Sequence, residues 1–390
     1  MTTDLDAARR RAATTYNAAA DTYDDPANTF WSRFGQASIT RLGLAPGSQV
    51  LDVCSGTGAS AIPAARVVGP AGTVLGIDLA GALLDRARAR ANAEGLTNIT
   101  FREGDLLDPA LPEWGYDAVV CVFGIFFVPE MEQAVSALWR LVKPGGRLAI
   151  TTWGPRLFEP ANAAFWNAIR DVRPELYKGF NPWDRITTPV TLKSLLVDSG
   201  IPAAAIAVEA ESATHPIGAP EAWWSLVMGS GYRGTVDQLT PAERETVRAA
   251  NDDFLRRTGT TEVEASVVYA VARKPATPDA LDALAASREH HRLLFENDRV
   301  RVLETRIPAG VTTAVHTHCW PSVVYYLARS PFVRRDGAGT ITLDSRTLPA
   351  EPGPPPAAAW IPALPPHSLE NVGEGDLHVI AVELKGEPAG

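Results

Sequence analysis

Residues 50–59 join a short apolar run to a glycine turn and then to a predicted helix. Gly56 and Gly58 let the backbone approach a ligand that a side chain would block. The first N–H groups of the following helix are free to bind a polar group of that ligand. This segment predicts a ligand-binding turn between a strand and a helix.

Two carboxylates follow the next two predicted strands in chain order. Asp78 ends the second strand, where a carboxylate is placed to accept hydrogen bonds from both hydroxyls of a ribose. Asp105 follows the third strand and is placed to accept from an exocyclic adenine amine, with Leu106 packing on the ring. A glycine turn alone is a weak signal, but the turn and these two acids in this order predict a nucleoside-containing cofactor.

The dinucleotide fingerprint is not met, because Gly58 is followed by Ala-Ser-Ala and no phosphate-binding lysine follows. Asp52 would repel a pyrophosphate but suits a cationic amino-acid group. Four segments resemble, in order, the motifs of class I S-adenosylmethionine-dependent methyltransferases: Val50–Gly58, Gly76–Asp78, Gly104–Asp105 and Lys143–Gly146. The similarity covers about residues 10–275 and is greatest to the ubiquinone/menaquinone-biosynthesis branch.

This resemblance implies S-adenosylmethionine as the cofactor. It implies that the turn from Asp52 to Gly58 holds the amino-acid end, Asp78 the ribose and Asp105 the adenine. The expected cofactor-binding residues are Tyr16, Tyr23, Asp52, Cys54, Gly56, Gly58, Asp78, Leu79, Asp105, Leu106 and Cys121. Cys54 stands where the family most often has glycine. Tyr16 and Tyr23 would close over the cofactor on a lid helix, or alternatively would only pack that helix.

Aromatic residues after the fourth strand predict an apolar or aromatic methyl acceptor. Phe123, Phe126 and Phe127 lie there, although core packing is the alternative for two of them. No Asn/Asp-Pro-Pro-Tyr element is present, which argues against methylation of adenine or of glutamine amides. The residues expected to cover the acceptor pocket are Trp223, Tyr232 and Arg233.

His215 is the candidate general base, if one is needed, and a purely structural histidine is the alternative. Methyl transfer to an atom that is already nucleophilic needs mainly alignment with the sulfonium and exclusion of water. The sequence therefore need not contain an elaborate set of acids and bases.

The C-terminal part of the chain carries a second group of chemistry-bearing residues. His316 and His318 are two residues apart, so on a strand they point to the same side. Two segments resemble the two motifs of the cupin family. In the first, five residues separate Gly310 from His316, and the second is a later proline-led turn with His367 and Asn371. The resemblance covers about residues 291–390 and implies a small β-barrel with a central pocket.

Ser322 or Val323 replaces the glutamate that is usual in cupins. Three imidazoles, from His316, His318 and His367, would still suit a divalent ion such as Fe(II), Zn(II) or Mn(II). The alternative is a metal-free pocket in which the histidines are hydrogen-bonded.

Short apolar runs alternate with helical stretches from residue 50 to residue 153, which indicates a parallel sheet covered on both faces. We therefore predict a doubly wound α/β, Rossmann-like methyltransferase domain over residues 1–275. A proline-containing linker is expected over 276–290. Short strands separated by Pro/Gly turns predict a small all-β, cupin-like barrel over 291–390.

Composition limits the partners and the compartment. The 390 residues include 36 Lys and Arg against 45 Asp and Glu, a net charge of −9, so nucleic acid is not an expected partner. No apolar run approaches the roughly 18–20 residues that span a bilayer, and the polar N-terminus is not a secretory signal. Three cysteines without CxxC spacing indicate neither a disulfide framework nor a cysteine-rich metal site. We expect a cytoplasmic homodimer that acts on a small molecule and binds no membrane.

Three functions remain open from the sequence. The first is a methyltransferase of specialised metabolism whose cupin domain dimerises the protein or shapes the acceptor pocket. The second is a bifunctional enzyme whose three-histidine metal site carries out a further oxidation or isomerisation. The third is a ligand-binding protein without catalysis.

Overall fold

The computed structural model describes residues 2–107, 111–112, 114–275, 281–297, 299–348 and 357–385. The chain divides into two compact units, Met1–Lys274 and Pro275–Gly390. Across these described ranges, we find no helix with both the length and the apolar character required for crossing a membrane.

The first unit is built on a seven-stranded sheet of order β3-β2-β1-β4-β5-β9-β6. The strands are β1 (Gln49–Val53), β2 (Thr73–Asp78), β3 (Ile99–Glu103), β4 (Tyr116–Val122), β5 (Val142–Trp153), β6 (Ile206–Glu211) and β9 (Val267–Arg273). The strands β1 to β5 pair in parallel, but β9 runs antiparallel to both β5 and β6. The wholly parallel sheet expected from the sequence is therefore corrected at this edge. Gly154, just after β5, donates to the carbonyl of Ser266, so β9 starts where β5 ends and must run back.

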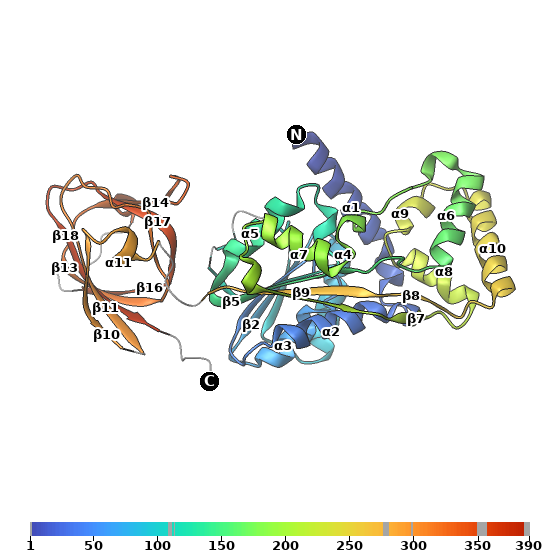
Figure 1. The fold of residues 1–390 in the computed structure, drawn as a ribbon, viewed down its shortest axis with the longest axis horizontal. Helices are drawn as coiled ribbons and strands as arrows, with labels where there is room; N and C mark the ends of the chain where they lie inside the picture. The colour runs from blue at the N-terminus through green and yellow to red at the C-terminus, as the bar shows by residue number, and fades with distance from the viewer. Residues whose placement is uncertain are drawn as a thin grey trace. The chain divides into compact units, whose positions relative to one another are not determined.

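Helices cover both faces of this sheet (Figure 1). Val50 of β1 packs with α2 (Phe30–Leu42) and α3 (Ala61–Val68), whereas its neighbour Leu51 packs with α4 (Gly81–Ala93) and α5 (Met131–Leu141). Successive side chains of a strand point to opposite faces, so a strand buried on both sides reads as a continuous apolar run. The predicted doubly wound α/β, Rossmann-like fold is confirmed.

Further helices complete the first unit, and their ends follow from local sequence. The helix α10 begins after Thr240, whose side chain accepts from the Glu243 N–H in a capping box, and ends at Gly259 in the left-handed conformation. The remaining elements are α1 (Thr2–Tyr23), α6 (Ala161–Val172), α7 (Pro189–Asp198), α8 (Pro220–Met228), α9 (Arg233–Val236), α10 (Pro241–Thr258), β7 (Thr214–Pro216) and β8 (Glu262–Glu264), with short 3₁₀ turns between them.

The second unit consists mainly of antiparallel strands in two sheets, which confirms the predicted small all-β domain. One sheet has the order β10-β11-β18-β13-β16, with β10 (His291–Glu296), β11 (Val300–Ile307), β13 (Ser322–Ala328), β16 (Ala357–Ile361) and β18 (Leu377–Leu384). The other has the order β12-β17-β14-β15, with β12 (His316–His318), β14 (Phe332–Asp336), β15 (Ile341–Asp344) and β17 (Leu364–Asn371).

The segment expected as a linker, 276–290, needs a partial correction. Residues 276–280 lie outside the described residues, but 281–290 pack within the second unit. They contain the short helix α11 (Ala283–Ala286), in which Ala283 is fully buried against Leu303. Asp282 forms a buried ion pair with Arg301. An apolar contact and an ion pair hold this segment to the β domain, which its prolines and polar residues did not indicate.

Candidate active site and candidate metal centre

A cavity lies where β1, β2 and β3 end, and we call it the strand-end cavity. It encloses about 740 Å³, part of it open to solvent. Its lining residues are Arg9, Ala12, Ala13, Tyr16, Tyr23, Cys54, Gly56, Asp78, Leu79, Ala80, Leu83, Gly104, Asp105, Leu106, Phe127 and Val128. The loops that follow three neighbouring parallel strands therefore meet the N-terminal helix α1 around one space, the usual ligand position in such sheets.

The glycine turn and Asp78 form the polar floor of the strand-end cavity. The Gly56 N–H donates to Asp78 Oδ2 and the Ala80 N–H donates to Asp78 Oδ1, both at 2.9 Å. Burial raises the pKa of Asp78, and these backbone bonds partly oppose that rise. Gly56 has a φ of 51°, and a Cβ there would stand 3.3 Å from the Tyr23 hydroxyl. Glycine thus keeps the space between the turn and α1 open.

Asp105 lies in the wall of the strand-end cavity beside a residue that the sequence did not single out. Asp105 Oδ2 pairs with Arg9 Nε at 2.6 Å, and Asp105 Oδ1 accepts from the Leu107 N–H at 2.7 Å. Arg9 comes from α1, at helical spacing from Ala12, Ala13 and Tyr16, which also line the cavity. This one-sided stripe is the signal that could have added Arg9 to the prediction.

Three predicted cofactor residues do not line the strand-end cavity. Asp52 is buried on β1, and its Oδ2 accepts from the hydroxyl of Ser60, which precedes α3, at 2.6 Å. Burial raises the pKa of Asp52 to about 7, against the bond from Ser60, which lowers it. A Cβ at Gly58 would meet Ile62 and Phe101 side-chain atoms, so this glycine serves close packing. Cys121 is fully buried on β4, and its side chain contacts that of Cys54.

A second cavity of about 720 Å³ in the first unit, the aromatic cavity, is walled largely by rings. Its lining residues are Tyr16, Trp31, Phe126, Phe127, Trp153, Leu157, Phe158, Trp166, Lys178, Phe180, Asn181, Pro182, Trp183, Ser230, Gly231 and Tyr232. Tyr16 and Phe127 line the strand-end cavity as well, and their rings meet edge to face with centroids 5.5 Å apart. These two rings form the wall that the two cavities share.

Three of the residues predicted for the acceptor pocket lie elsewhere. Phe123 is buried behind the lining, stacked on Trp153 with centroids 3.7 Å apart. Trp223 is fully buried and its Nε1 donates to Asn251 Oδ1 at 2.9 Å. Arg233 forms an ion pair with Asp237 one helical turn later. Phe126, Phe127 and Tyr232 do line the aromatic cavity.

His215, the candidate general base, lies away from both cavities. It is buried in β7, its Nε2 hydrogen-bonds with the Ala27 carbonyl at 2.6 Å and its ring packs edge to face on Phe30. Burial lowers the pKa of His215. This geometry corresponds to the structural alternative. The imidazole links β7 to the N-terminal segment around Ala27 and does not face a cavity.

Comparison with known proteins gives a match over the segment that contains the glycine turn, Asp78 and Asp105. Residues 50–146 match the family model described as a methyltransferase domain. This segment is similar to methyltransferase domains. This agrees with the class of enzyme predicted from the motifs, and the matched segment holds β1 to β4 with the turns that line the cavity.

Named relatives align with the same region. Nocamycin O-methyltransferase of Saccharothrix syringae is 34% identical over 129 residues, 33% of this chain and 46% of the relative. Aklanonic acid methyltransferase DauC of Streptomyces sp. (strain C5) is 29% identical over 187 residues, 45% of this chain and 85% of the relative. The ubiquinone/menaquinone biosynthesis C-methyltransferase UbiE of Pseudomonas fluorescens is 32% identical over 152 residues, 39% of this chain and 57% of the relative. The chain thus spans about half the length of two of these three relatives.

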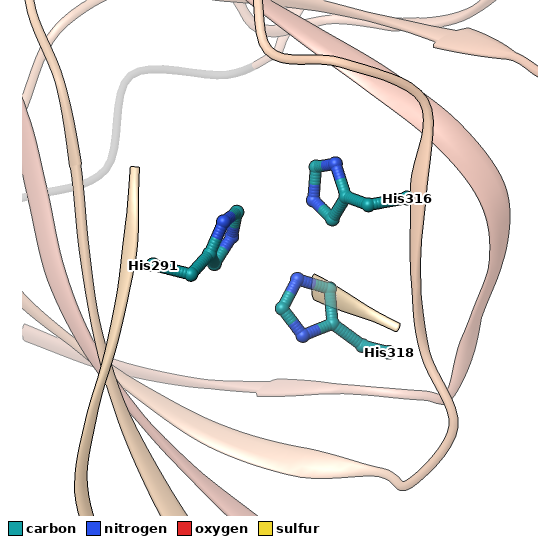
Figure 2. Close-up of side chains that lie close together, drawn as sticks. All are labelled: His291, His316 and His318. Atoms are coloured by element: carbon teal, nitrogen blue, oxygen red, sulfur yellow. The ribbon is translucent and has the colours of Figure 1, made fainter. Parts of the chain in front are cut away.

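The second unit holds a compact group of imidazoles. His291, His316 and His318 each offer a ring nitrogen, and these atoms lie within 4.8 Å of one another. Figure 2 shows the three rings converging, His291 from β10 and the other two from β12. This compact group includes His291, which was not part of the set predicted from the sequence (His316, His318 and His367). His367 pairs with His316 across β12 and β17, with ring centroids 4.4 Å apart, and adjoins the group.

Hydrogen bonds fix the tautomer of each histidine around this group. The Nδ1 atoms of His291, His316 and His367 bond to the carbonyls of Ser287, Ala314 and Pro365 at 3.0, 2.8 and 2.8 Å. His318 Nδ1 bonds to Glu383 Oε1 at 2.7 Å. Each Nδ1 donates to an oxygen, so each Nε2 keeps its lone pair, as in metal-binding histidines oriented by a second partner.

Burial keeps these rings uncharged. It lowers the pKa of His291 to about 2 and of His318 to about 3, aided in both by the neighbouring histidines. Glu383, which orients His318, is itself fully buried and paired with Arg301, which also pairs with Asp282 at 2.8 Å. Neutral imidazoles with oriented lone pairs are the form that coordinates a metal ion. The sequence did not indicate His291, because only the tertiary fold brings β10 of one sheet close to β12 of the other.

Proposed function

We propose that the first unit transfers a methyl group from S-adenosylmethionine to a small aromatic molecule of specialised metabolism. When bound, S-adenosylmethionine supplies an electrophilic methyl group: a nucleophilic atom bonds to the carbon as the carbon–sulfur bond breaks, its electron pair stays on sulfur, and S-adenosylhomocysteine remains. The observation that carries the proposal is the wall of Tyr16 and Phe127 shared by the strand-end and aromatic cavities.

The residues of the strand-end cavity fit this donor. Asp78 has carboxylate lone pairs for ribose hydroxyls beyond the two backbone bonds it accepts. Because Gly56 has no side chain, the space next to Tyr23 stays free for the ligand. Leu106 and Leu83 give apolar surface for a base, and Asp105 is held at its place by Arg9. A volume of about 740 Å³ lies within the roughly 300–1,000 Å³ range of small-molecule pockets.

The aromatic cavity fits a flat acceptor. Trp153, Trp166 and Trp183 offer ring faces and edges for stacking. Lys178 lines the same cavity, and burial together with the charge of Arg11 lowers its pKa. A cation there favours an acidic hydroxyl or carboxyl group on the acceptor. The names of the relatives, an O-methyltransferase of nocamycin and a methyltransferase of aklanonic acid, support an acceptor of this kind.

Catalysis on this proposal depends on position more than on proton transfer. The described residues that line the aromatic cavity include no histidine, aspartate or glutamate. Its apolar rings exclude water, and the Tyr16–Phe127 wall sets the direction from which an acceptor reaches the methyl group. Holding two reactants in line supplies up to about 7–11 kcal/mol of barrier reduction.

Donor binding and acceptor turnover test the proposal separately. We expect calorimetry on the full chain to show binding of S-adenosylmethionine and S-adenosylhomocysteine, and Asp78→Ala to weaken both by about 30- to 150-fold, the loss of roughly 2–3 kcal/mol. Asp85→Ala is the matched control, since Asp85 pairs with Arg88 on the exposed side of α4. Methyl-labelled donor offered with aromatic hydroxy acids should label the acceptor. Absence of donor binding in the wild type would contradict the proposal.

We also propose that the second unit binds a divalent metal ion through His291, His316 and His318, which is the bifunctional alternative. The oriented Nε2 lone pairs of these three buried, neutral rings support it. Three imidazoles suit Fe(II), Zn(II) or Mn(II), and a bound ion would supply Lewis-acid chemistry. Metal analysis of the full chain should find one ion that His318→Gln removes and His378→Gln retains, since His378 pairs with Glu304 outside the group. Equal metal content in both variants would contradict this site.

A further inference from the structure

The second unit encloses a cavity of about 700 Å³, the histidine cavity, between its two sheets. Strand after strand contributes residues at a spacing of two, for example Phe332 and Arg334 on β14. The lining residues are His291, Thr305, Ile307, His316, His318, Ser322, Val324, Tyr326, Phe332, Arg334, Ile361, Leu364, His367, Leu369, Leu377, Val379 and Ala381. Apolar side chains make up most of this surface, and the polar groups are few.

Arg334 is the one positively charged residue in that lining among the described residues. Its side chain is half-buried, and burial lowers the pKa of its guanidinium. In the part of the chain that the structure describes, no carboxylate pairs with it. Neighbouring arginines differ in this respect, since Arg335 pairs with Glu370 and Arg301 with Asp282 and Glu383.

An arginine held half-buried in an apolar cavity without an acidic partner is costly for the protein alone. The cost is removed when a ligand brings the missing negative charge. The guanidinium has a planar fork of donors that matches a carboxylate in two hydrogen bonds. A phosphate, with about two charges, would call for further cations, and the described lining offers neutral imidazoles in their place.

We propose that the histidine cavity binds a small, mostly apolar carboxylic acid, with its carboxylate on Arg334. Its body packs on the apolar side chains of both sheets, such as Val324 and Leu369, and its other end faces the histidines. This site is independent of methyl transfer in the first unit. It does not require the proposed metal, because Arg334 supplies the recognition.

Benzoate and its neutral analogue benzamide test the site. The full chain is treated with EDTA and saturated with S-adenosylhomocysteine, so that metal and donor sites do not contribute. Calorimetry or saturation-transfer NMR should show that benzoate binds the wild type at least 10-fold more tightly than benzamide does. Arg334→Gln should remove that preference, whereas Arg335→Gln, the neighbour paired with Glu370, should keep it.

The stability of the ligand-free variant separates binding from a structural role. Arg334→Gln should keep or raise the melting temperature, because it removes a half-buried charge that has no described acidic partner. Benzoate should raise the melting temperature of the wild type and leave that of Arg334→Gln unchanged. Equal binding of the two probes, no binding of either, retention of the preference in Arg334→Gln, or a fall of several degrees in its melting temperature would each overturn the proposal.

Discussion

The strand-end cavity of the first unit takes most of its polar residues from strand ends and the loops that follow them, whereas the histidine cavity of the second unit takes them from the strands themselves. Cys54, Gly56 and Asp78 stand within a few residues of a strand end. His291, Arg334 and His367 stand on strands far apart in the sequence. Loop residues in chain order form a motif that can be recognised, but inward-facing strand residues share only their period of two.

The two units also treat buried charge differently. Asp52 in the first unit is buried with its Oδ1 unpartnered among the described residues, and its pKa is raised. In the second unit, Arg301 joins two buried carboxylates, and one of them, Glu383, orients His318. The buried ion pairs of the second unit thus help to orient a residue of its site. The buried Asp52 of the first unit does not line the strand-end cavity. The following predictions test these contrasts.

The largest expected effect is on the buried pairs of the second unit. Arg301→Leu leaves Asp282 and Glu383 buried without their cation, so we expect the second unit to lose about 3–5 kcal/mol of stability. Hydrogen exchange of peptides from β11 and β18 measures this loss. Arg306→Leu, which breaks only an exposed pair with Asp376, should change stability by less than about 1 kcal/mol. Equal effects of the two variants would contradict the contrast.

The next effect is a pH dependence of the first unit from Asp52. Its folded pKa of about 7 lies above the unfolded value near 4, so between these values the folded state keeps a proton that the unfolded state releases. Stability from this group is therefore present at low pH and lost as the pH rises from 4 to 7, by roughly 2–4 kcal/mol. Urea unfolding followed by helical circular dichroism reports the first unit. Asp52→Asn should remove most of this slope, and an unchanged slope would contradict it.

A smaller effect separates the two histidine sets. His291→Gln should lower metal affinity about 100-fold, because it removes a ligand from the compact group. His367→Gln should lower it less than 10-fold, since His367 only adjoins that group. Titration of the metal-free full chain with Zn(II) measures both. The reverse order would restore the set predicted from sequence and break the structural assignment.

The smallest effect concerns the wall shared by the two cavities of the first unit. Phe127→Ala should lower kcat/KM for an aromatic acceptor about 10-fold, because the ring that contacts Tyr16 no longer sets the direction from which the acceptor reaches the methyl group. Donor affinity should fall less, since many other residues line the strand-end cavity. Trp360→Ala, an exposed ring of the second unit, is the control and should leave both constants unchanged.

The central strands of the first unit were predictable because they are largely buried on both faces of the sheet. The apolar runs at 49–53, 73–78 and 116–122 coincide with β1, β2 and β4. The direction of β9 was not predictable, since it depends on where the helical segment returns to the sheet. Residues whose role is packing, such as Gly58 and Trp223, looked like ligand residues because the same types serve both purposes.

The sequence alone determined the Rossmann-like domain, the glycine turn with its acids and the change to an all-β domain. These rest on local order along the chain, where motif, strand end and turn are a few residues apart. Only the tertiary structure decided that Arg9 joins Asp105, that His291 lies beside His316 and His318, and that Arg334 lines the same cavity as the histidines. Such contacts join residues that are distant in the sequence. They depend on how strands pair and helices pack, which the local sequence pattern does not specify.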